Sequence, residues 1–346
     1  MAYSSITKPG LHFKPVAFTG NASAGHAITG VGFQPDWVWL KTVGSINNHM
    51  IFDVIRGVSK RIRSNQTNAQ NTASGVTSFD TDGFTVGADS AGNVSGSMVS
   101  WNWKAANSQG SSNTDGSINT TYTSVNSTAG FSISTYEGTG GAATVGHGLG
   151  VTPAMVLVKN IDVTQNWHMY HQGIGATKYL RLNSTSASAT NSGFWNDTAP
   201  TSSVFSIGNN GSVTGNGQTH VAYCFAEKKG YSKFGTYVGN GNADGTFIYL
   251  GFKPAFIMVK SATSTTEWHM SDIARRPNNP NNSYLSASSS AAENTSNPTD
   301  FLSNGVKIRT SNNGWNKSGD TFIYWAFAEN PLVANVGANG IPATAR

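Results

Sequence analysis

Three histidines at corresponding points of the sequence are the first candidates for chemistry. His49, His168 and His269 each precede a methionine, and a tryptophan precedes the second and the third. A histidine can ligate a metal, transfer a proton or contact a sugar. The three are far apart in the sequence and lack the short spacing of a helix-borne zinc site. We therefore expect structural histidines that bond to backbone carbonyls, and we predict no metal and no cofactor.

Carboxylates give no stronger basis for catalysis, because none of them recurs at all three corresponding places. A glycosidase needs two carboxyl groups on one cleft, one with a raised pKa, and no spacing singles out Asp36 and Asp53 for these roles. No serine lies in a nucleophile-elbow motif. Asp80 and Asp82 suggest calcium, but the later oxygen ligands of an EF-hand are missing, so we expect a tight turn. The sequence predicts that the protein is not an enzyme.

Two aromatic groups with neighbouring amides are candidates for a sugar site. They are Trp195 with Asn196 and Asp197, and Trp315 with Asn316. A carbohydrate offers apolar ring faces together with hydroxyl groups, which an aromatic ring and an amide can contact at the same time. The alternative is a tryptophan that covers the end of a sandwich beneath a loop.

A basic cluster is the candidate for docking a partner. It lies in "RGVSKRIRS" and consists of Arg56, Lys60, Arg61 and Arg63. Such a cluster could contact an acidic protein surface or phosphate groups. The alternative is a solvated edge strand that its charges protect from stray pairing.

A sequence pattern that occurs three times must position these residues. Its main stretch reads "GFQPDWVWLK" (32–41), "GVTPAMVLVK" (150–159) and "GFKPAFIMVK" (251–260). An aromatic-x-Gly stands before each copy, and a His-Met pair and then "FTVG" (84–87), "FSIG" (205–208) or "VKIR" (306–309) follow it. The closing strands are "VSWNWKA" (99–105), "VAYCFAE" (221–227) and "IYWAFAE" (323–329). Five landmarks in one order predict three β-units of about 100 residues.

Both faces of the recurring strand are apolar. Trp37, Met155 and Phe256 correspond to one another, and large apolar residues occupy the next two positions of each copy. Such a strand is covered on both sides, whereas a sugar-stacking platform would alternate with polar residues. We therefore predict a buried core that contains Trp37, Trp39, Trp101 and Trp103. We expect the strand-end lysines to reach solvent; these are Lys41, Lys159 and Lys260.

Composition favours an all-β protein. Only 11% of residues are charged, 11% are aromatic, and there are 39 glycines; this combination is typical of short strands joined by many turns. The net charge of +5 is too dilute to predict nucleic-acid binding. A single cysteine, Cys224, excludes an internal disulfide. No apolar run approaches the roughly 20 residues of a membrane span, so we expect no membrane insertion.

The predicted architecture is three tandem β-sandwich repeats of the jelly-roll or lectin-like kind, with short arms at both ends. Residues 1–12 form an N-terminal attachment arm that no repeat includes. The predicted repeats and connections are repeat 1 (13–107), a Ser/Thr/Asn/Gly-rich linker (108–128) with one strand near its end, repeat 2 (129–230), repeat 3 (231–330) and a C-terminal tail (331–346). The N-terminus has no apolar signal-peptide region, so we expect synthesis in the host cytoplasm.

Several blocks of the chain resemble repeat-containing virion proteins of marine tailed bacteriophages. The blocks are "MAYSSITKPGLHF", "GFQPDWVWLK…FDVIRG", "SFDTDGF…VSWNWKA", "FWNDTAPTSSVFSIG", "AYCFAEKKGYSKFGTYVGNG" and "IYWAFAENP…ATAR". The resemblance covers nearly the whole chain and implies lectin-like β-sandwich modules, a place on the virion surface and no catalytic motif.

The resemblance leads to three alternative functions. The first is a tail-fibre or tail-tip protein that attaches to host surface glycan. The second is a head decoration or cement protein, and the third is a polysaccharide-degrading enzyme. The expected partners are other virion proteins, host surface carbohydrate and sister subunits, with a trimer favoured by analogy with phage surface projections.

Overall fold

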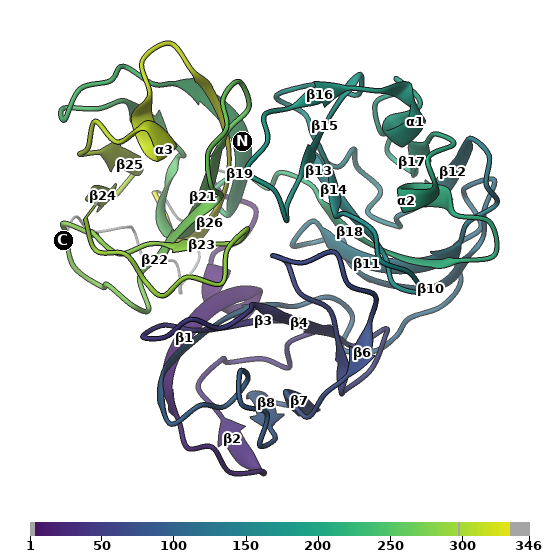
Figure 1. The fold of residues 1–346 in the computed structure, drawn as a ribbon, viewed down its shortest axis with the longest axis horizontal. Coiled ribbons are helices and arrows are strands. Elements are labelled where there is room, and N and C mark those ends of the chain that lie inside the picture. The colour runs from purple at the N-terminus through teal and green to yellow at the C-terminus, as the bar shows by residue number, and fades with distance from the viewer. Residues whose placement is uncertain (1–3, 297, 333–346) are drawn as a thin grey trace.

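The computed structural model describes residues 4–296 and 298–332. The predicted all-β class is confirmed, because the described helices are single turns: η1 (Pro9–Leu11), α1 (Ser192–Trp195), α2 (Gly211–Thr214) and α3 (Asn313–Asn316). Three sandwich units surround a common centre (Figure 1). We refer to residues 13–103 as unit 1, residues 120–225 as unit 2 and residues 232–331 as unit 3.

Each unit has one large antiparallel sheet in which the last strand of the unit pairs with its recurring apolar strand. On its other side the last strand pairs with the first strand in units 1 and 3, and with the second strand, β11, in unit 2. In unit 1 the order is β1 (Phe13–Gly20), β9 (Gly96–Trp103), β3 (Trp37–Thr42) and β4 (Met50–Asp53). In unit 2 it is β10 (Thr120–Asn126), β11 (Phe131–Glu137), β18 (Thr219–Phe225), β13 (Met155–Asn160), β14 (His168–His171), β15 (Lys178–Arg181) and β16 (Ala189–Thr190). In unit 3 it is β19 (Ser232–Val238), β26 (Thr321–Pro331), β21 (Phe252–Ser261), β22 (His269–Asp272) and β23 (Leu285–Ser286).

A smaller sheet covers the outer face of each large sheet (Figure 1). Its strands are β2 (His26–Ile28), β8 (Gly83–Val86) and β7 (Val76–Asp80) in unit 1, β12 (Ala143–Gly146) and β17 (Val204–Ile207) in unit 2, and β20 (Phe247–Tyr249), β25 (Gly305–Ile308) and β24 (Thr299–Leu302) in unit 3. A short ribbon, β5 (Lys60–Arg61) with β6 (Asn71–Thr72), completes unit 1. A separate apolar cluster fills the space between the two layers of each unit.

The recurring strands occupy equivalent places in the three units. Trp37 pairs with Trp103, Met155 with Phe225, and Phe256 with Phe327. The glycine that opens each copy has a positive φ, 87° at Gly32, 70° at Gly150 and 79° at Gly251. That conformation strains a residue with a β-carbon, which explains why glycine precedes the strand in every copy.

The inner faces of the three large sheets share one core. Trp37, Trp39, Trp101 and Trp103 are fully buried, as predicted. The ring of Trp37 stacks on Tyr223 of unit 2 with 4.7 Å between centroids, and Phe13 stacks on Phe327 of unit 3 at 4.7 Å. Because this cluster contains residues of all three units, the three units share one interior.

Polar contacts also join each unit to the next one around the common centre. The Asp53 carboxylate accepts a hydrogen bond of 2.6 Å from the Tyr223 hydroxyl of unit 2. The Asp272 carboxylate of unit 3 accepts one of 3.1 Å from the Trp101 indole of unit 1. His171, at the corresponding place of unit 2, contacts the Tyr324 carbonyl oxygen of unit 3 through its Nε2 at 3.1 Å. Each unit thus reaches the last strand of the next unit, and the third closes on the first.

The strand pairing shows that the three predicted histidines are not at equivalent positions. Met50 pairs with Leu40, whereas His168 pairs with Val158 and His269 with Val259. Met50, His168 and His269 stand at the same distance from Trp37, Met155 and Phe256, so His49 corresponds to Trp167 and Trp268, and the His-Met pair of unit 1 lies one position earlier than the other two. These three residues all bond to a carbonyl of a neighbouring unit: His49 with Ser286 (3.0 Å), Trp167 with Arg63 (2.8 Å) and Trp268 with Arg181 (3.0 Å).

The three strand-end lysines are buried, and the expectation that they reach solvent is wrong. Each ammonium group folds back onto the backbone and donates to the next residue's carbonyl: Lys41 to Thr42 (2.8 Å), Lys159 to Asn160 (2.6 Å) and Lys260 to Ser261 (2.6 Å). Burial lowers the pKa of each of them to about 8. The lysines fix the turns that follow the central strands, because they supply donors to otherwise buried carbonyl groups.

The described part of the N-terminal arm is held by its own chain. Ser4 and Ile6 are buried, and the Ser5 amide donates to the Lys229 carbonyl oxygen at 3.1 Å. A sister subunit is therefore not needed to order residues 4–12. The strand predicted near the end of the linker is β10, which pairs with β11. Residues 1–3 of the arm and 333–346 of the tail lie outside the described residues.

We predict that Trp103→Ala destabilises all three units together. Truncating a buried tryptophan typically costs about 3–5 kcal/mol, and Trp103 contacts Phe225 of unit 2 and Phe327 of unit 3. Calorimetry should show a single unfolding transition at a lower temperature, and Ile46→Ala, at a position with 76% exposure, serves as the control. A remaining transition at the original temperature would mean that units 2 and 3 fold independently.

Candidate functional site

The tryptophans predicted to contact sugar are buried, and that interpretation is wrong. Trp195 is 2% exposed and Trp315 is 0% exposed. Both lie on single-turn helices in the outer layers of their units, α1 and α3. Trp195 packs edge-on against Tyr170, and Trp315 stacks on His269. The alternative, a tryptophan that covers the end of a sandwich, is the observed arrangement.

The neighbouring polar residues have structural roles or lie apart from an aromatic face. The Asn316 amide donates to the Asn240 side chain, the Asn242 carbonyl and the Thr310 carbonyl, and so holds the 240–242 loop. Asn196 and Asp197 are exposed and have left-handed backbone conformations, each with a φ of 49°. They form the end of helix α1 and do not face a cleft with Trp195.

The predicted docking cluster is mostly internal. Arg56 is paired with Asp53 at 2.6 Å, and Arg61 is paired with Asp89 at 3.0 Å. The Arg63 guanidinium donates to Gln66 at 3.1 Å, and Lys60 is the exposed member. Arg56 and Arg61 therefore join parts of unit 1 and do not form a basic surface.

The carboxylates considered for catalysis and calcium also have local partners. Asp36 is buried and accepts the backbone N–H of Ala105 at 2.6 Å and of Asn107 at 3.0 Å, and burial raises its pKa to about 6. Asp82 accepts the backbone N–H of Gly30 at 3.0 Å, and Asp80 accepts the Thr85 hydroxyl at 2.8 Å. Among residues 4–296 and 298–332, no three His, Cys, Asp or Glu side chains are grouped to hold a metal.

The candidate histidines are buried and neutral. Burial lowers the pKa of His49, His168 and His269 to about 3. The ring of His168 stacks on Phe194 at 4.1 Å and that of His269 on Trp315 at 5.4 Å. His168 and His269 therefore act as flat packing groups between the layers, whereas His49 lies against Trp39 and Trp101 in the shared core.

An open cleft between units 2 and 3 is the better candidate site. Its volume is about 220 Å³, and its lining includes Glu227, Lys229, Ser232, Lys233 and Tyr249. Glu227 and Lys229 come from the connection that leaves β18, Lys233 from the start of β19, and Tyr249 from the end of β20. The connection into unit 3 and the end of β20 thus bring a carboxylate, two ammonium groups and an aromatic ring together. We call this hollow the Tyr249 cleft.

The Tyr249 ring is held in place yet remains accessible. Its side chain is 54% exposed, and the Lys233 ammonium lies 5.0 Å from the ring centroid. The same ammonium donates to the Tyr249 carbonyl oxygen at 2.9 Å, which fixes the lysine against the loop. A cation over an aromatic face is an attractive arrangement. The ring is therefore presented to solvent in a defined orientation.

The Tyr249 cleft offers hydrogen-bonding groups of both kinds. The Lys229 and Lys233 ammonium groups can donate hydrogen bonds, and the Glu227 carboxylate accepts them. Glu227 is the one carboxylate among the lining residues, whereas glycoside hydrolysis uses a pair of carboxyl groups. The composition of the cleft therefore suits a polyhydroxylated ligand.

The sequence of β20 contains a signal for this cleft that lies outside the recurring pattern. Phe247 and Tyr249 are 41% and 54% exposed, while Ile248 and Leu250 are buried. This alternation marks a strand with one solvent-facing side that carries large aromatic residues. Isolated exposed apolar residues are common in proteins, so only the structure shows that Tyr249 borders a cleft.

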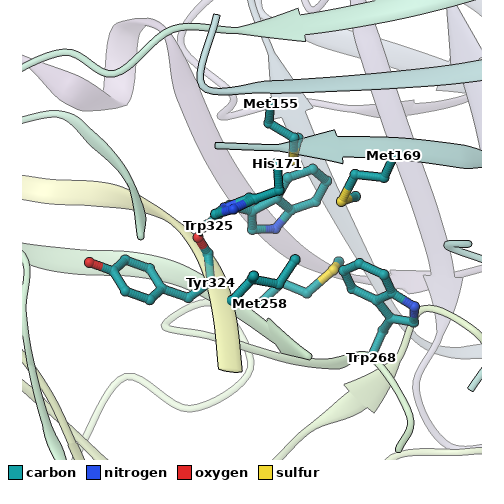
Figure 2. A pocket seen from close by; sticks show the side chains of 8 residues that line it. Met155, Met169, His171, Met258, Trp268, Tyr324 and Trp325 are labelled. Atoms are coloured by element: carbon teal, nitrogen blue, oxygen red, sulfur yellow. Dashed lines mark hydrogen bonds between the residues drawn. The ribbon is translucent and has the colours of Figure 1, made fainter. Parts of the chain in front are cut away.

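A second hollow, enclosed between units 2 and 3, is a packing gap. Figure 2 shows the side chains of Met155, Met169 and Met258 turned toward one another between the rings of Trp268 and Trp325. Its volume is about 10 Å³, which is at the lower limit for one water molecule. His171 occupies the position that Asp53 and Asp272 occupy in the other two units. The Trp325 indole N–H has no hydrogen-bond partner among the described residues.

Residues 8–331 match the model of DUF7483, which is described as a domain of unknown function. Neither the curated proteins nor the solved structures give a significant match to the chain. The matched range runs from the N-terminal arm to the end of β26, so the matched domain comprises all three units, in agreement with their shared core. No helix in the described residues is long and apolar enough to span a membrane.

We predict that the protein loses stability as the pH falls below 6.5. Burial also lowers the pKa of His171 and His220, to about 4, so five histidines stay neutral in the fold but bind protons when unfolded. Each contributes stability above pH 6.5 that is lost by about 1.4 kcal/mol per pH unit below it. The raised pKa of Asp36 increases the free energy of unfolding as the pH falls below 6. This contribution of one group is smaller than the loss from the five histidines.

The measurement is the melting temperature from pH 7.5 to 4.5, with an expected fall of about 10 °C or more between pH 6.5 and 5.5. His171→Gln keeps a donor for Tyr324 and an acceptor for Gly173, so its pH profile should be shallower. His26→Gln, at a half-buried position, is the matched control. A constant melting temperature from pH 6.5 to 5 would show that the buried histidines are not neutral.

Proposed function

The chain belongs to the DUF7483 family, and we propose that it is a structural protein of a bacteriophage virion that attaches to host surface glycan through the Tyr249 cleft. The virion location rests on the resemblance to repeat-containing virion proteins. The attachment role rests on one observation: a half-exposed aromatic ring lies in a hollow with hydrogen-bonding groups of both kinds. Within the virion, a tail-fibre or tail-tip position fits attachment, and other virion proteins are the proposed partners.

The cleft has the composition that a saccharide requires. The faces of a sugar ring are apolar and stack on aromatic side chains, while its hydroxyl groups need donors and acceptors. Tyr249 supplies the first, and Lys229, Lys233 and Glu227 supply the second. The ring and the lysine that orients it belong to strands of a packed sandwich, so the site needs little reorganisation to bind.

We predict that Tyr249→Ala lowers the affinity for the bound glycan about tenfold without unfolding the protein. An aromatic contact contributes about 0.5–1.5 kcal/mol beyond burial of its area, and 1.4 kcal/mol corresponds to a factor of ten. The measurement is binding to immobilised bacterial surface polysaccharides, with melting temperature as the check on folding. Tyr249→Phe should retain most of the affinity.

The matched control is Tyr122→Ala, which removes a 38% exposed tyrosine from the edge of unit 2. Equal loss of binding in both variants would indicate nonspecific adhesion by exposed aromatic residues. Immunogold labelling of purified virions tests the location. Label on the capsid instead of the tail would favour head decoration.

A further inference from the structure

A second cleft lies at the junction where unit 3 meets unit 1. Its volume is about 350 Å³, and its lining includes Lys8, Gly10, Lys14, Gly32 and Glu329. These residues come from the N-terminal arm, the start of β1, the glycine before β3 and the end of β26. We call it the Lys14 cleft.

The two clefts are built at the same place relative to their units. Phe13 pairs with Trp103 and Ser232 with Phe327, so Lys14 corresponds to Lys233. The Lys14 ammonium donates to the Gly30 carbonyl oxygen at 2.7 Å, as that of Lys233 does to Tyr249 at 2.9 Å. In both cases the accepting carbonyl is two residues before the recurring glycine.

The acidic residue of each cleft also corresponds. Glu227 and Glu329 both stand two residues beyond the closing-strand phenylalanine of the preceding unit, Phe225 and Phe327. The Lys14 cleft therefore reproduces the glutamate, the lysine and the glycine corner of the Tyr249 cleft. The aromatic ring is absent, because Gly30 takes the place of Tyr249.

The third junction, between units 1 and 2, is closed. Ala105 stands in the place of the glutamate and Ser132 in that of the lysine. Gly148 takes the place of Tyr249, and a side chain there would meet Thr123 and Val125 of β10 at 3.5 and 3.7 Å. The extra strand β10 thus covers the position where the other two junctions are open.

We propose that the Lys14 cleft is a second glycan site, which takes the carboxylate-bearing residues of an acidic saccharide. The Glu329 carboxylate lies 2.6 Å from the Lys253 ammonium, so an internal cation balances its charge. Lys8 and Lys14 then leave the cleft with net positive charge, which favours a uronic acid over a neutral sugar. This inference rests on the proposed function and extends it from one site to two.

The arrangement makes the chain bivalent toward a single surface. Both clefts lie between the start of a first strand and the end of a last strand, at junctions that succeed each other around the ring. They therefore open toward the same end of the ring. A polysaccharide layer could occupy both at once, and a second contact on a rigid body strengthens overall binding without any new chemistry.

The test is calorimetric titration with tetramannuronate, an acidic oligosaccharide, and with neutral mannotetraose. We expect two acidic-sugar sites per chain in the unmodified protein. Tyr249→Ala should weaken one site about tenfold and leave the other unchanged. Lys14→Met should remove the other site, and the double variant should keep only the weakened site. Lys14→Arg should keep both sites, and Lys60→Met is the control for loss of an exposed lysine elsewhere.

On a surface coated with polymeric mannuronate, dissociation should be at least about tenfold slower for the unmodified protein than for either single-cleft variant. One site per chain that Tyr249→Ala weakens would overturn the second site while the proposed function stands. Binding of mannotetraose but not of tetramannuronate, weakened by Tyr249→Ala, would also overturn the second site while the proposed function stands. Binding that neither variant affects would overturn the proposed function as well.

If Lys14→Met lowers the melting temperature, Lys8→Ala replaces it as the test. Lys8 is exposed and borders the same cleft, so its removal takes away one cation without touching the Lys14 contact to Gly30. Loss of the second acidic-sugar site in this variant supports the proposal, and unchanged affinity for tetramannuronate contradicts it.

Discussion

Burial of the aromatic inner faces of the three large sheets is the constraint on which the fold depends. A single unit would expose the inner row of its central and closing strands, which in unit 1 includes Trp37, Trp39, Trp101 and Trp103. An apolar surface of that size is unstable in water unless another surface covers it. Three units arranged in a ring cover one another, so the sandwich layers, the joints and the clefts all follow from that arrangement.

The polar groups at the joints are compatible with this apolar interior because they are paired. Asp53 binds Arg56 at 2.6 Å and Asp272 binds Arg275 at 2.7 Å, each within its own unit. The paired carboxylate then accepts a hydrogen bond from the neighbouring unit. An unpaired buried charge would be strongly destabilising. At the third joint the neutral His171 removes the need for a counter-ion, and the space is filled by flexible methionine side chains.

The sequence was sufficient to predict what depends on patterns of apolar residues. Corresponding apolar runs, preceded by a glycine, identified the central strands and the burial of Trp37 and Trp39. It was misleading where a side chain's environment is made by distant segments. Trp195 lies in a polar stretch yet is buried, and Lys41 ends a strand yet bonds to its own turn. The Tyr249 cleft requires the connection after β18 to meet the end of β20, which no local pattern records.

The two ends of the described chain lie beside the same residue, because Ser4 contacts Gly230 and Leu332 borders the cleft that Gly230 lines. The chain could therefore begin with any of the three units and still form the same ring. A circularly permuted chain that starts with unit 2 and ends with unit 1 would have the same joints, provided that a short linker connects residues 332 and 4. Inheritance of such a ring as one polypeptide also lets each joint change alone, which a ring of three identical subunits does not allow.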